Sequence, residues 1–190
     1  AVFYTVIANS SDQALGLLSY LNICPAHGSI EIGHVCFGHA LQRSTLASET
    51  VYLLARYAFE LGNRRLEWKC DNANLRSKRA AERFGFSYEG LFRQHLIRKG
   101  RNRDTAWFSL LDHEWPACCA AFERWLAADN FDAQGKQRDK TGWGGKDIAH
   151  HYAVGIGGGG QRDGADLRER DRRLVVREPP LQRVHLAAEL

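Results

Sequence analysis

The sequence predicts a mixed α+β fold in which a mostly antiparallel, twisted sheet is flanked by helices. Three observations carry this prediction. Two strand-like runs, over residues 29–37 and 64–70, each lead through a short polar loop into a segment with helical periodicity. Two further pairs of strand-like runs are separated by polar turns, which is typical of hairpins. The length of 190 residues is normally one domain.

A hairpin opens the predicted sheet. Residues 3–8 and 14–22 are predicted to be its strands, and a polar run at residues 9–12 supplies the turn. Residues 25–28 then turn the chain into a central strand over residues 29–37, which alternates apolar and polar side chains.

A loop over residues 42–47 joins the central strand to a helix. Residues 46–61 repeat apolar side chains at three- and four-residue intervals up to Gly62, which is typical of a helix with one apolar face. The N–H groups of a first helical turn are unpaired and carry partial positive charge, so the backbone of residues 44–47 is predicted to accept phosphate oxygens. The alternative is an ordinary capped turn, with Ser44 or Thr45 as the N-cap.

The second strand, residues 64–70, alternates Leu66, Trp68 and Cys70 against charged neighbours, as a half-buried strand does. Asn74 is expected to cap a helix over residues 75–84, and Gly85 fits the left-handed position that ends it. Basic residues gather around these two elements: Arg64, Arg65, Lys69, Arg76, Lys78, Arg79 and Arg83. They favour either a phosphate-rich partner or a solvated basic face.

The C-terminal half begins with a second hairpin. Residues 91–98 and 103–111 flank a turn at residues 99–102, and residues 117–128 have the spacing of a last helix. From Gly135 onward the chain holds 10 of its 18 glycines together with dense charge. We therefore expect a core domain over residues 1–134 and a tail over residues 135–190 that is disordered or aberrant and has no chemistry assigned.

Composition and charge argue against a membrane-spanning, secreted, metal-binding or nucleic-acid-binding protein. The net charge of +4 is mild, and the chain shows neither an apolar run of membrane-spanning length nor a signal peptide, so a cytoplasmic protein is expected. Five cysteines form an odd set without metal-type spacing, which favours reduced thiols and no metal site. A nucleic-acid partner is not expected, because no aromatic platform or reading helix is recognisable.

Three of these motifs, in this order, resemble the GNAT acetyltransferases, and more closely the RimJ/RimL-type branch that acetylates protein N-termini. The family's pyrophosphate loop, Gln/Arg-x-x-Gly-x-Gly/Ala, corresponds to residues 42–47. Its Asn-x-x-Ser turn corresponds to residues 74–77, and its Gly-Phe-x-x-Glu-Gly motif to residues 85–90. The resemblance extends over residues 3–115.

The resemblance implies transfer of an acetyl group from acetyl-CoA to a primary amine, with a protein N-terminal α-amine as the first candidate acceptor. In the family, backbone N–H groups of the central strand support the oxyanion, the loop binds the diphosphate, and the Asn-x-x-Ser turn faces the cofactor. The cofactor-binding residues implied here are His34, Val35, Cys36, Phe37, Gln42, Arg43, Ser44, Thr45, Leu46, Ala47, Asn74 and Ser77.

Three side chains are predicted to act in catalysis: Ser77, Glu89 and His95. Ser77 would protonate the leaving thiolate, and Glu89 and His95 are candidate bases, with Glu31 and Glu67 as further candidates. An α-amine with a pKa near 7.7–8.0 is partly neutral at cellular pH and so demands less of a base than lysine does. Glu89 and His95 are expected to share one side of their strand with Leu91, and Glu31 has the alternative of a cross-strand arginine partner.

Other hypotheses stay open beside this one. The acceptor could be a small-molecule amine, or the chain could be a non-catalytic CoA-binding domain. Thr45 favours the second, because the family usually has glycine at that position. The chain also has no methionine, and the strand and two helices that precede residues 2–7 in the family are missing, so a fragment is expected. The sequence does not decide between these two acceptors, and it does not predict the oligomeric state.

Overall fold

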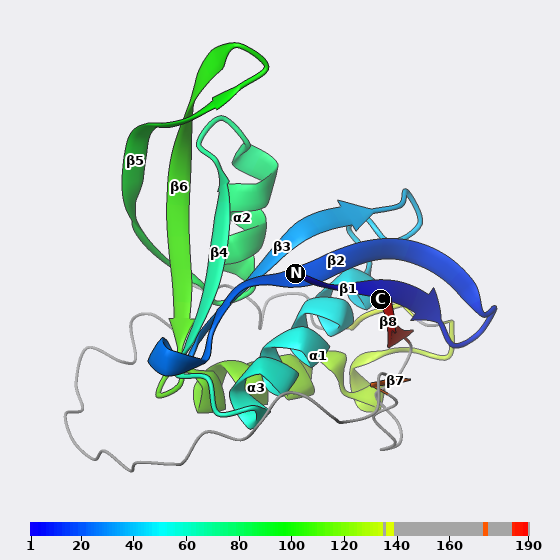
Figure 1. Cartoon of the computed structure of the whole chain (residues 1–190). Coiled ribbons are helices and arrows are strands. Elements are labelled where there is room, and N and C mark those ends of the chain that lie inside the picture. The colour runs from blue at the N-terminus through cyan, green and yellow to red at the C-terminus, as the bar shows by residue number, and fades with distance from the viewer. Residues whose placement is uncertain (135, 139–172, 175–183, 190) are drawn as a thin grey trace.

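The computed structural model describes residues 1–134, 136–138, 173–174 and 184–189 (Figure 1). The strands are β1 (Val2–Ala8), β2 (Gln13–Cys24), β3 (Ser29–Phe37), β4 (Arg65–Asp71), β5 (Ser87–Arg98), β6 (Arg101–Leu111), β7 (Arg173–Leu174) and β8 (Val184–Glu189). The α-helices are α1 (Thr45–Glu60), α2 (Leu75–Arg83) and α3 (Trp115–Leu126), and short 3-10 helices lie at Pro25–His27 and Ala128–Asn130. The predicted mixed α+β class is confirmed.

The strands form one sheet in the order β5-β6-β4-β3-β2-β1-β8-β7. Each neighbouring pair is antiparallel except β3 and β4, which are parallel. The two predicted hairpins are therefore present as β1–β2 and β5–β6. Strands β7 and β8 come from the segment predicted as a tail, and the other positions of that prediction, apart from residues 136–138, lie outside the described residues.

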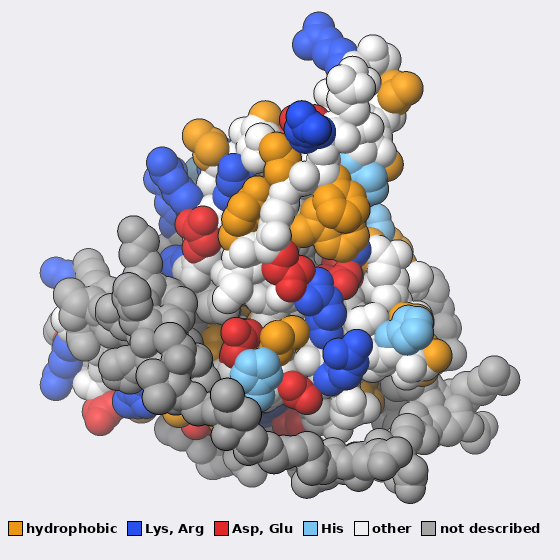
Figure 2. Space-filling model, turned by 90° about the vertical axis from the view of Figure 1, so that its left-hand side faces the viewer, with side chains coloured by type: hydrophobic (Ala, Val, Ile, Leu, Met, Phe, Trp, Pro, Cys, Tyr) orange, Lys and Arg blue, Asp and Glu red, His pale blue; other side chains and the backbone are white. Residues whose placement is uncertain are grey.

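The β5–β6 hairpin extends beyond the rest of the sheet (Figure 1). Figure 2 shows blue basic and orange hydrophobic side chains over this projecting part, with red and blue side chains mixed below it. Strand β5 is exposed along almost its whole length, and its pairing with β6 shifts register twice, between Tyr88 and Gly90 and between Phe92 and Leu96. These irregularities insert extra residues into β5 and break its simple alternation.

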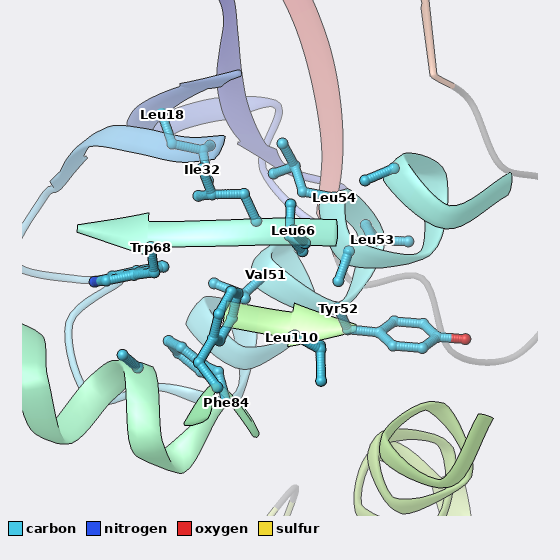
Figure 3. Packing of buried hydrophobic residues seen from close by; sticks show 14 of the residues in the cluster. Leu18, Ile32, Val51, Tyr52, Leu53, Leu54, Leu66, Trp68, Phe84 and Leu110 are labelled. Carbon is cyan, nitrogen blue, oxygen red and sulfur yellow. The ribbon is translucent and has the colours of Figure 1, made fainter. Parts of the chain in front are cut away.

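The helices lie on one face of the sheet. The connections β3–α1–β4 and β4–α2–β5 advance in the same direction across the sheet, and right-handed crossovers then place α1 and α2 on the same side. Leu66 and Trp68 of β4 are buried in this layer, where Figure 3 shows them near Val51 of α1. Helix α3 packs on α1 through Phe122, whose ring centroid is 5.4 Å from that of Tyr52.

The opposite face of the sheet is called the open face here, because none of α1, α2 and α3 covers it. On β4 it carries Arg65, Glu67 and Lys69, which alternate with the buried residues as predicted. On β6 it carries Trp107 and Ser109, the partners of Lys69 and Glu67 in the antiparallel register. The charged side of β4 therefore lies away from the helices.

Candidate active site

The parallel strands β3 and β4 separate partway along their length. Their pairing covers four positions, from Ser29↔Arg65 to Ile32↔Trp68, and then stops. Beyond that point β3 continues beside β2, and β4 continues beside β6. An opening between the two strands follows at their carboxyl ends. This is the end at which open sheets with parallel strands bind ligands.

Strand β3 carries a bulge beside this opening. Ser19 and Leu17 of β2 pair with Gly33 and Cys36, so β3 has one residue more than β2 in the same interval. His34 within the bulge has a φ of 49°, in the left-handed region. Its Nδ1 lies 2.8 Å from the hydroxyl of Ser19, and its ring stacks on Phe3. The bulge changes the direction of the backbone over residues 33–37.

The loop between β3 and α1 ends in a capped helix. The Ser44 hydroxyl accepts a hydrogen bond from the Ala47 N–H at 3.2 Å, so the cap interpretation of this turn is confirmed at Ser44. The side-chain amide of Gln42 donates to the Phe37 carbonyl at 2.8 Å and ties the loop to the end of β3. Among the described residues, the N–H groups of Thr45 and Leu46 have no hydrogen-bond partner. Two donors at this helix start are therefore free for an anion.

The position at which Thr45 replaces the expected glycine does not require a glycine backbone. Thr45 is the first residue of α1 and is absent from the residues with positive φ, whereas Arg43, two residues earlier, has a φ of 58°. The threonine therefore adds a side chain near the free N–H groups but no backbone strain.

Removal of the cap tests the local stability of this loop. We expect Ser44→Ala to lower the free energy of unfolding by about 1 kcal/mol, because the Ala47 N–H loses its acceptor. Ser44→Asp, which restores an acceptor, should recover most of the loss. Urea unfolding of the two variants and the wild type measures this; equal stability of Ser44→Ala and wild type would contradict it.

The start of α2 lies on the helix side of the opening. The Asn74 side chain accepts from the Ser77 N–H at 3.1 Å and caps the helix as predicted. The Ser77 hydroxyl accepts from Nε1 of buried Trp68 at 3.0 Å. Burial raises the pKa of the Cys70 thiol, and a hydrogen bond with Ser77 acts in the opposite direction. Ser77 is thus held against Trp68, the last residue of β4 that pairs with β3.

The open face carries a chain of ion pairs. Lys69 Nζ lies 2.8 Å from a carboxylate oxygen of Glu31 and 2.8 Å from one of Glu67. Arg65 donates to Glu67 at 2.9 Å and makes two hydrogen bonds, of 2.7 and 2.6 Å, to the carboxylate of Glu89. Burial raises the pKa of Glu67, but hydrogen bonds from Lys69 and Arg65 outweigh burial, so the pKa is lowered overall.

Glu89 is held in the same way. Its hydrogen bonds from Arg65 lower its pKa against the opposing effect of burial, and the Ser109 hydroxyl donates to it at 2.7 Å. A carboxylate whose pKa is lowered is a weaker base, because it takes up a proton only in more acidic solution. Glu89 therefore suits the role of an anchor for Arg65 better than that of a base.

The predicted partners of Glu89 along its strand are corrected by the structure. Glu89 bonds Ser109 on the open face, whereas Leu91 pairs with Ala106, which is buried on the helix side. The expectation that Glu89 and Leu91 share one side is wrong, because the register shift after Tyr88 breaks the period of two.

His95 lies farther along the open face. Its Nδ1 is 3.0 Å from the hydroxyl of Thr105, and its ring contacts Phe92 and Trp107. Thr105 and Ser109, the contacts of His95 and Glu89, are four residues apart on β6, which corresponds to about 13 Å along a strand. Ser77, Glu89 and His95, the three side chains predicted to be catalytic, therefore do not form one cluster.

Comparison with known proteins places this geometry in a family. Residues 1–87 match the acetyltransferase (GNAT) domain. An uncharacterized N-acetyltransferase p20 of Bacillus licheniformis is 32% identical over 113 residues, which are 59% of this chain and 63% of that protein. A GCN5-related N-acetyltransferase from Brucella melitensis is 47% identical, with a TM-score of 0.71 over 78% of this chain and 66% of that one. The chain contains a GNAT-family acetyltransferase domain.

A further structural relative agrees with this assignment. A probable GNAT-family acetyltransferase from Chromobacterium violaceum is 57% identical, with a TM-score of 0.59 over 60% of this chain and 58% of that one. The chain spans 58%, 63% and 66% of the lengths of these relatives. Of the helices in the described ranges, none combines the length and hydropathy needed to cross a membrane.

The GNAT domain brings the predicted cofactor residues to one end of the sheet. His34, Val35, Cys36 and Phe37 lie within and directly after the bulge of β3, and residues 42–47 lead from this strand into α1. Asn74 and Ser77 lie at the start of α2, directly after β4. Because β3 and β4 are parallel, all three groups lie around the opening. Ser77 is on the helix side, whereas Glu89 and His95 are on the open face.

Two features of the site were missed in the sequence. The partner of Glu31 is Lys69 rather than the expected arginine, and Asn22 also donates to Glu31 at 2.6 Å. The ammonium of Lys69 lies over the ring of Trp107, 38 residues later in the chain. The alternation along β4 predicts that Lys69 and Trp68 point to opposite faces of the sheet. It does not predict which residues of the neighbouring strands Lys69 contacts.

The pH dependence of stability tests the state of Glu89 in the GNAT domain. Its folded-state pKa is depressed, so its contribution is fully present above the ordinary value of 4.5 and is lost as the pH falls through the folded-state pKa. We expect wild type to lose more stability than Glu89→Gln below about pH 4.5 and a constant difference between about pH 5.5 and pH 7. The side chain is 38% exposed, so the effect should stay below about 1 kcal/mol. Urea unfolding across this range measures it; parallel pH profiles would contradict it.

Proposed function

We propose that this chain transfers an acetyl group from acetyl-CoA to a primary amine. The observation that carries the proposal is the opening between β3 and β4, with the free N–H groups of Thr45 and Leu46 at the same end. A helix start with two free donors suits the diphosphate of the coenzyme. The backbone over residues 34–37 would then donate to the oxyanion that forms on the thioester carbonyl.

Side chains on opposite faces of the sheet would carry out the two proton transfers of the reaction. The neutral amine attacks the thioester carbon, the C–S bond breaks, and the electron pair leaves on sulfur. Ser77, on the helix side, would pass its hydroxyl proton to this thiolate and take up a proton from water in its place. On the open face His95 is the better candidate to take up the proton from nitrogen, directly or through water, because Glu89 is already engaged by Arg65 and Ser109.

The acceptor that we propose is a protein N-terminal α-amine, as in the RimJ/RimL-type branch, with a small-molecule amine as the second candidate. The first is chemically less demanding, because an α-amine is partly neutral near pH 7 and needs only a modest base. We also propose a cytoplasmic location. All five cysteines are free thiols, which suits a reducing compartment.

Acceptor-dependent thiol release tests the proposed function. The chain is mixed with acetyl-CoA and either peptides with free N-termini, the same peptides with blocked N-termini and a lysine, or small amines. We expect thiol release with the free peptides and a mass increase of one acetyl group at their N-termini. Thiol release that occurs only with small amines would favour the second acceptor. Thermal stabilisation by acetyl-CoA without transfer to any acceptor would contradict the enzyme and favour a CoA-binding domain.

A further inference from the structure

The ammonium group of Lys69 lies among groups that bind cations. Its Nζ is 2.8 Å from Oε2 of Glu31 and 2.8 Å from Oε2 of Glu67. It also lies 3.8 Å from the ring centroid of Trp107. Charged hydrogen bonds and an aromatic face are the interactions by which proteins bind primary ammonium ions. The Lys69 ammonium therefore lies between groups of the kind that bind a primary ammonium ion.

The side chains around the Lys69 ammonium are largely shielded from solvent. The side chain of Glu31 is 6% exposed, and those of Lys69 and Glu67 are each 15% exposed. Each carboxylate has a second donor that orients it, Asn22 on Glu31 at 2.6 Å and Arg65 on Glu67 at 2.9 Å. Loss of the Lys69 ammonium would leave two carboxylates close together and poorly hydrated. Two such carboxylates would favour the binding of another cation in place of the Lys69 ammonium.

The position lies at the opening. Glu31 and Glu67 form the pair directly before the last one between β3 and β4, and Lys69 is the first residue of β4 beyond that pairing. All of these side chains are on the open face, across the sheet from Ser77. In the proposed function the acceptor reaches the thioester from this face, on which the Lys69 ammonium lies.

We propose that Glu31, Glu67 and Trp107 form a primary-ammonium site, that Lys69 fills this site from within the chain, and that Lys69 thereby excludes acceptors with a second cationic amine. The first two parts concern binding alone. The third part, on acceptor choice, rests on the proposed function. Lys69 is in this sense a specificity residue, whose ammonium takes the place that the second amine of a diamine would need.

Thermal unfolding of Lys69→Ala tests occupancy without any acetyl-CoA. The substitution removes a propylammonium group, so n-propylammonium chloride is the probe. At ten times its dissociation constant we expect the probe to raise the melting temperature of the variant by about 3–5 °C. Wild type, Lys136→Ala at an exposed lysine, and the double variant Lys69→Ala with Glu31→Gln should show no such rise. Tetramethylammonium chloride at the same concentration controls for ionic strength.

An equal response of Lys69→Ala and wild type would overturn the proposal. If Lys69→Ala does not fold by itself, refolding from urea with and without the probe replaces the melt. A folded yield that rises with n-propylammonium supports the site, and no recovery in either condition counts against it.

Acceptor choice is then measured separately. We expect Lys69→Ala to raise kcat/KM for diaminoalkanes relative to monoamines at least about tenfold over wild type, which corresponds to about 1.4 kcal/mol. An unchanged ratio would overturn the exclusion role even where the melt supports the site. If no variant transfers acetyl groups, the proposed function fails while the melt still decides the ammonium site.

Discussion

Replacement of Ser77 by alanine is expected to lower kcat for acetyl transfer by about 100-fold or more, with little change in KM. The reason is that Ser77 is the hydroxyl on the helix side of the opening and would protonate the leaving thiolate. Steady-state thiol release with a peptide acceptor measures the effect. Ser87→Ala, at an exposed serine at the start of β5, is the matched control and should retain wild-type turnover.

A structural role of Ser77 would give a different result. Ser77→Ala leaves the indole N–H of Trp68 without its acceptor, which should lower stability by about 1 kcal/mol without preventing the domain from folding. Acetyl-CoA binding to this variant should stay within about twofold of wild type. A loss of turnover that is matched by an equal loss of coenzyme binding would remove Ser77 from the chemical step.

Replacement of Trp68 by alanine is expected to lower the free energy of unfolding by about 3–5 kcal/mol. Trp68 is 4% exposed, and its ring lies 6.1 Å from Phe84 and 5.8 Å from Phe86, between centroids. Truncation would therefore leave a cavity between β4 and the end of α2. Urea unfolding measures the loss.

Trp68→Phe separates packing from hydrogen bonding at the same position. It keeps an aromatic ring and removes the donor to Ser77, so about 1 kcal/mol should be lost. Equal losses in Trp68→Phe and Trp68→Ala would contradict the cavity explanation. A loss below about 1 kcal/mol in Trp68→Ala would contradict the packing shown in Figure 3.

Much of the fold was predictable because local periodicity decides it. Strand β3 has the predicted bounds, 29–37, and α1 begins one residue before the predicted 46. The alternation of Leu66 and Trp68 with charged neighbours correctly identified a half-buried strand. Helix α2 also begins at Leu75 directly after its predicted cap, Asn74, because a side-chain acceptor at that position satisfies a first-turn N–H.

The site was less predictable, because strand register and bulges depend on contacts distant in sequence. The pairing of Lys69 with Glu31 joins strands that are separated by α1, and no local pattern reports it. The extra residues in β5 displaced Leu91 from the side of Glu89, since a one-residue insertion changes the face of every later side chain. The end of β3–β4 pairing after Ile32 is likewise a property of two strands together.

Coenzyme binding at the start of α1 is tested directly by isothermal titration of acetyl-CoA into wild type and Thr45→Glu. An acidic residue in a first helical turn favours the helix, so Thr45→Glu should keep its stability while it repels the diphosphate at the free N–H groups. We predict at least about tenfold weaker binding to Thr45→Glu, and wild-type affinity for Gln134→Glu, an exposed residue outside α1 and the loop before it. Equal affinity of Thr45→Glu and wild type would contradict coenzyme binding at the start of α1.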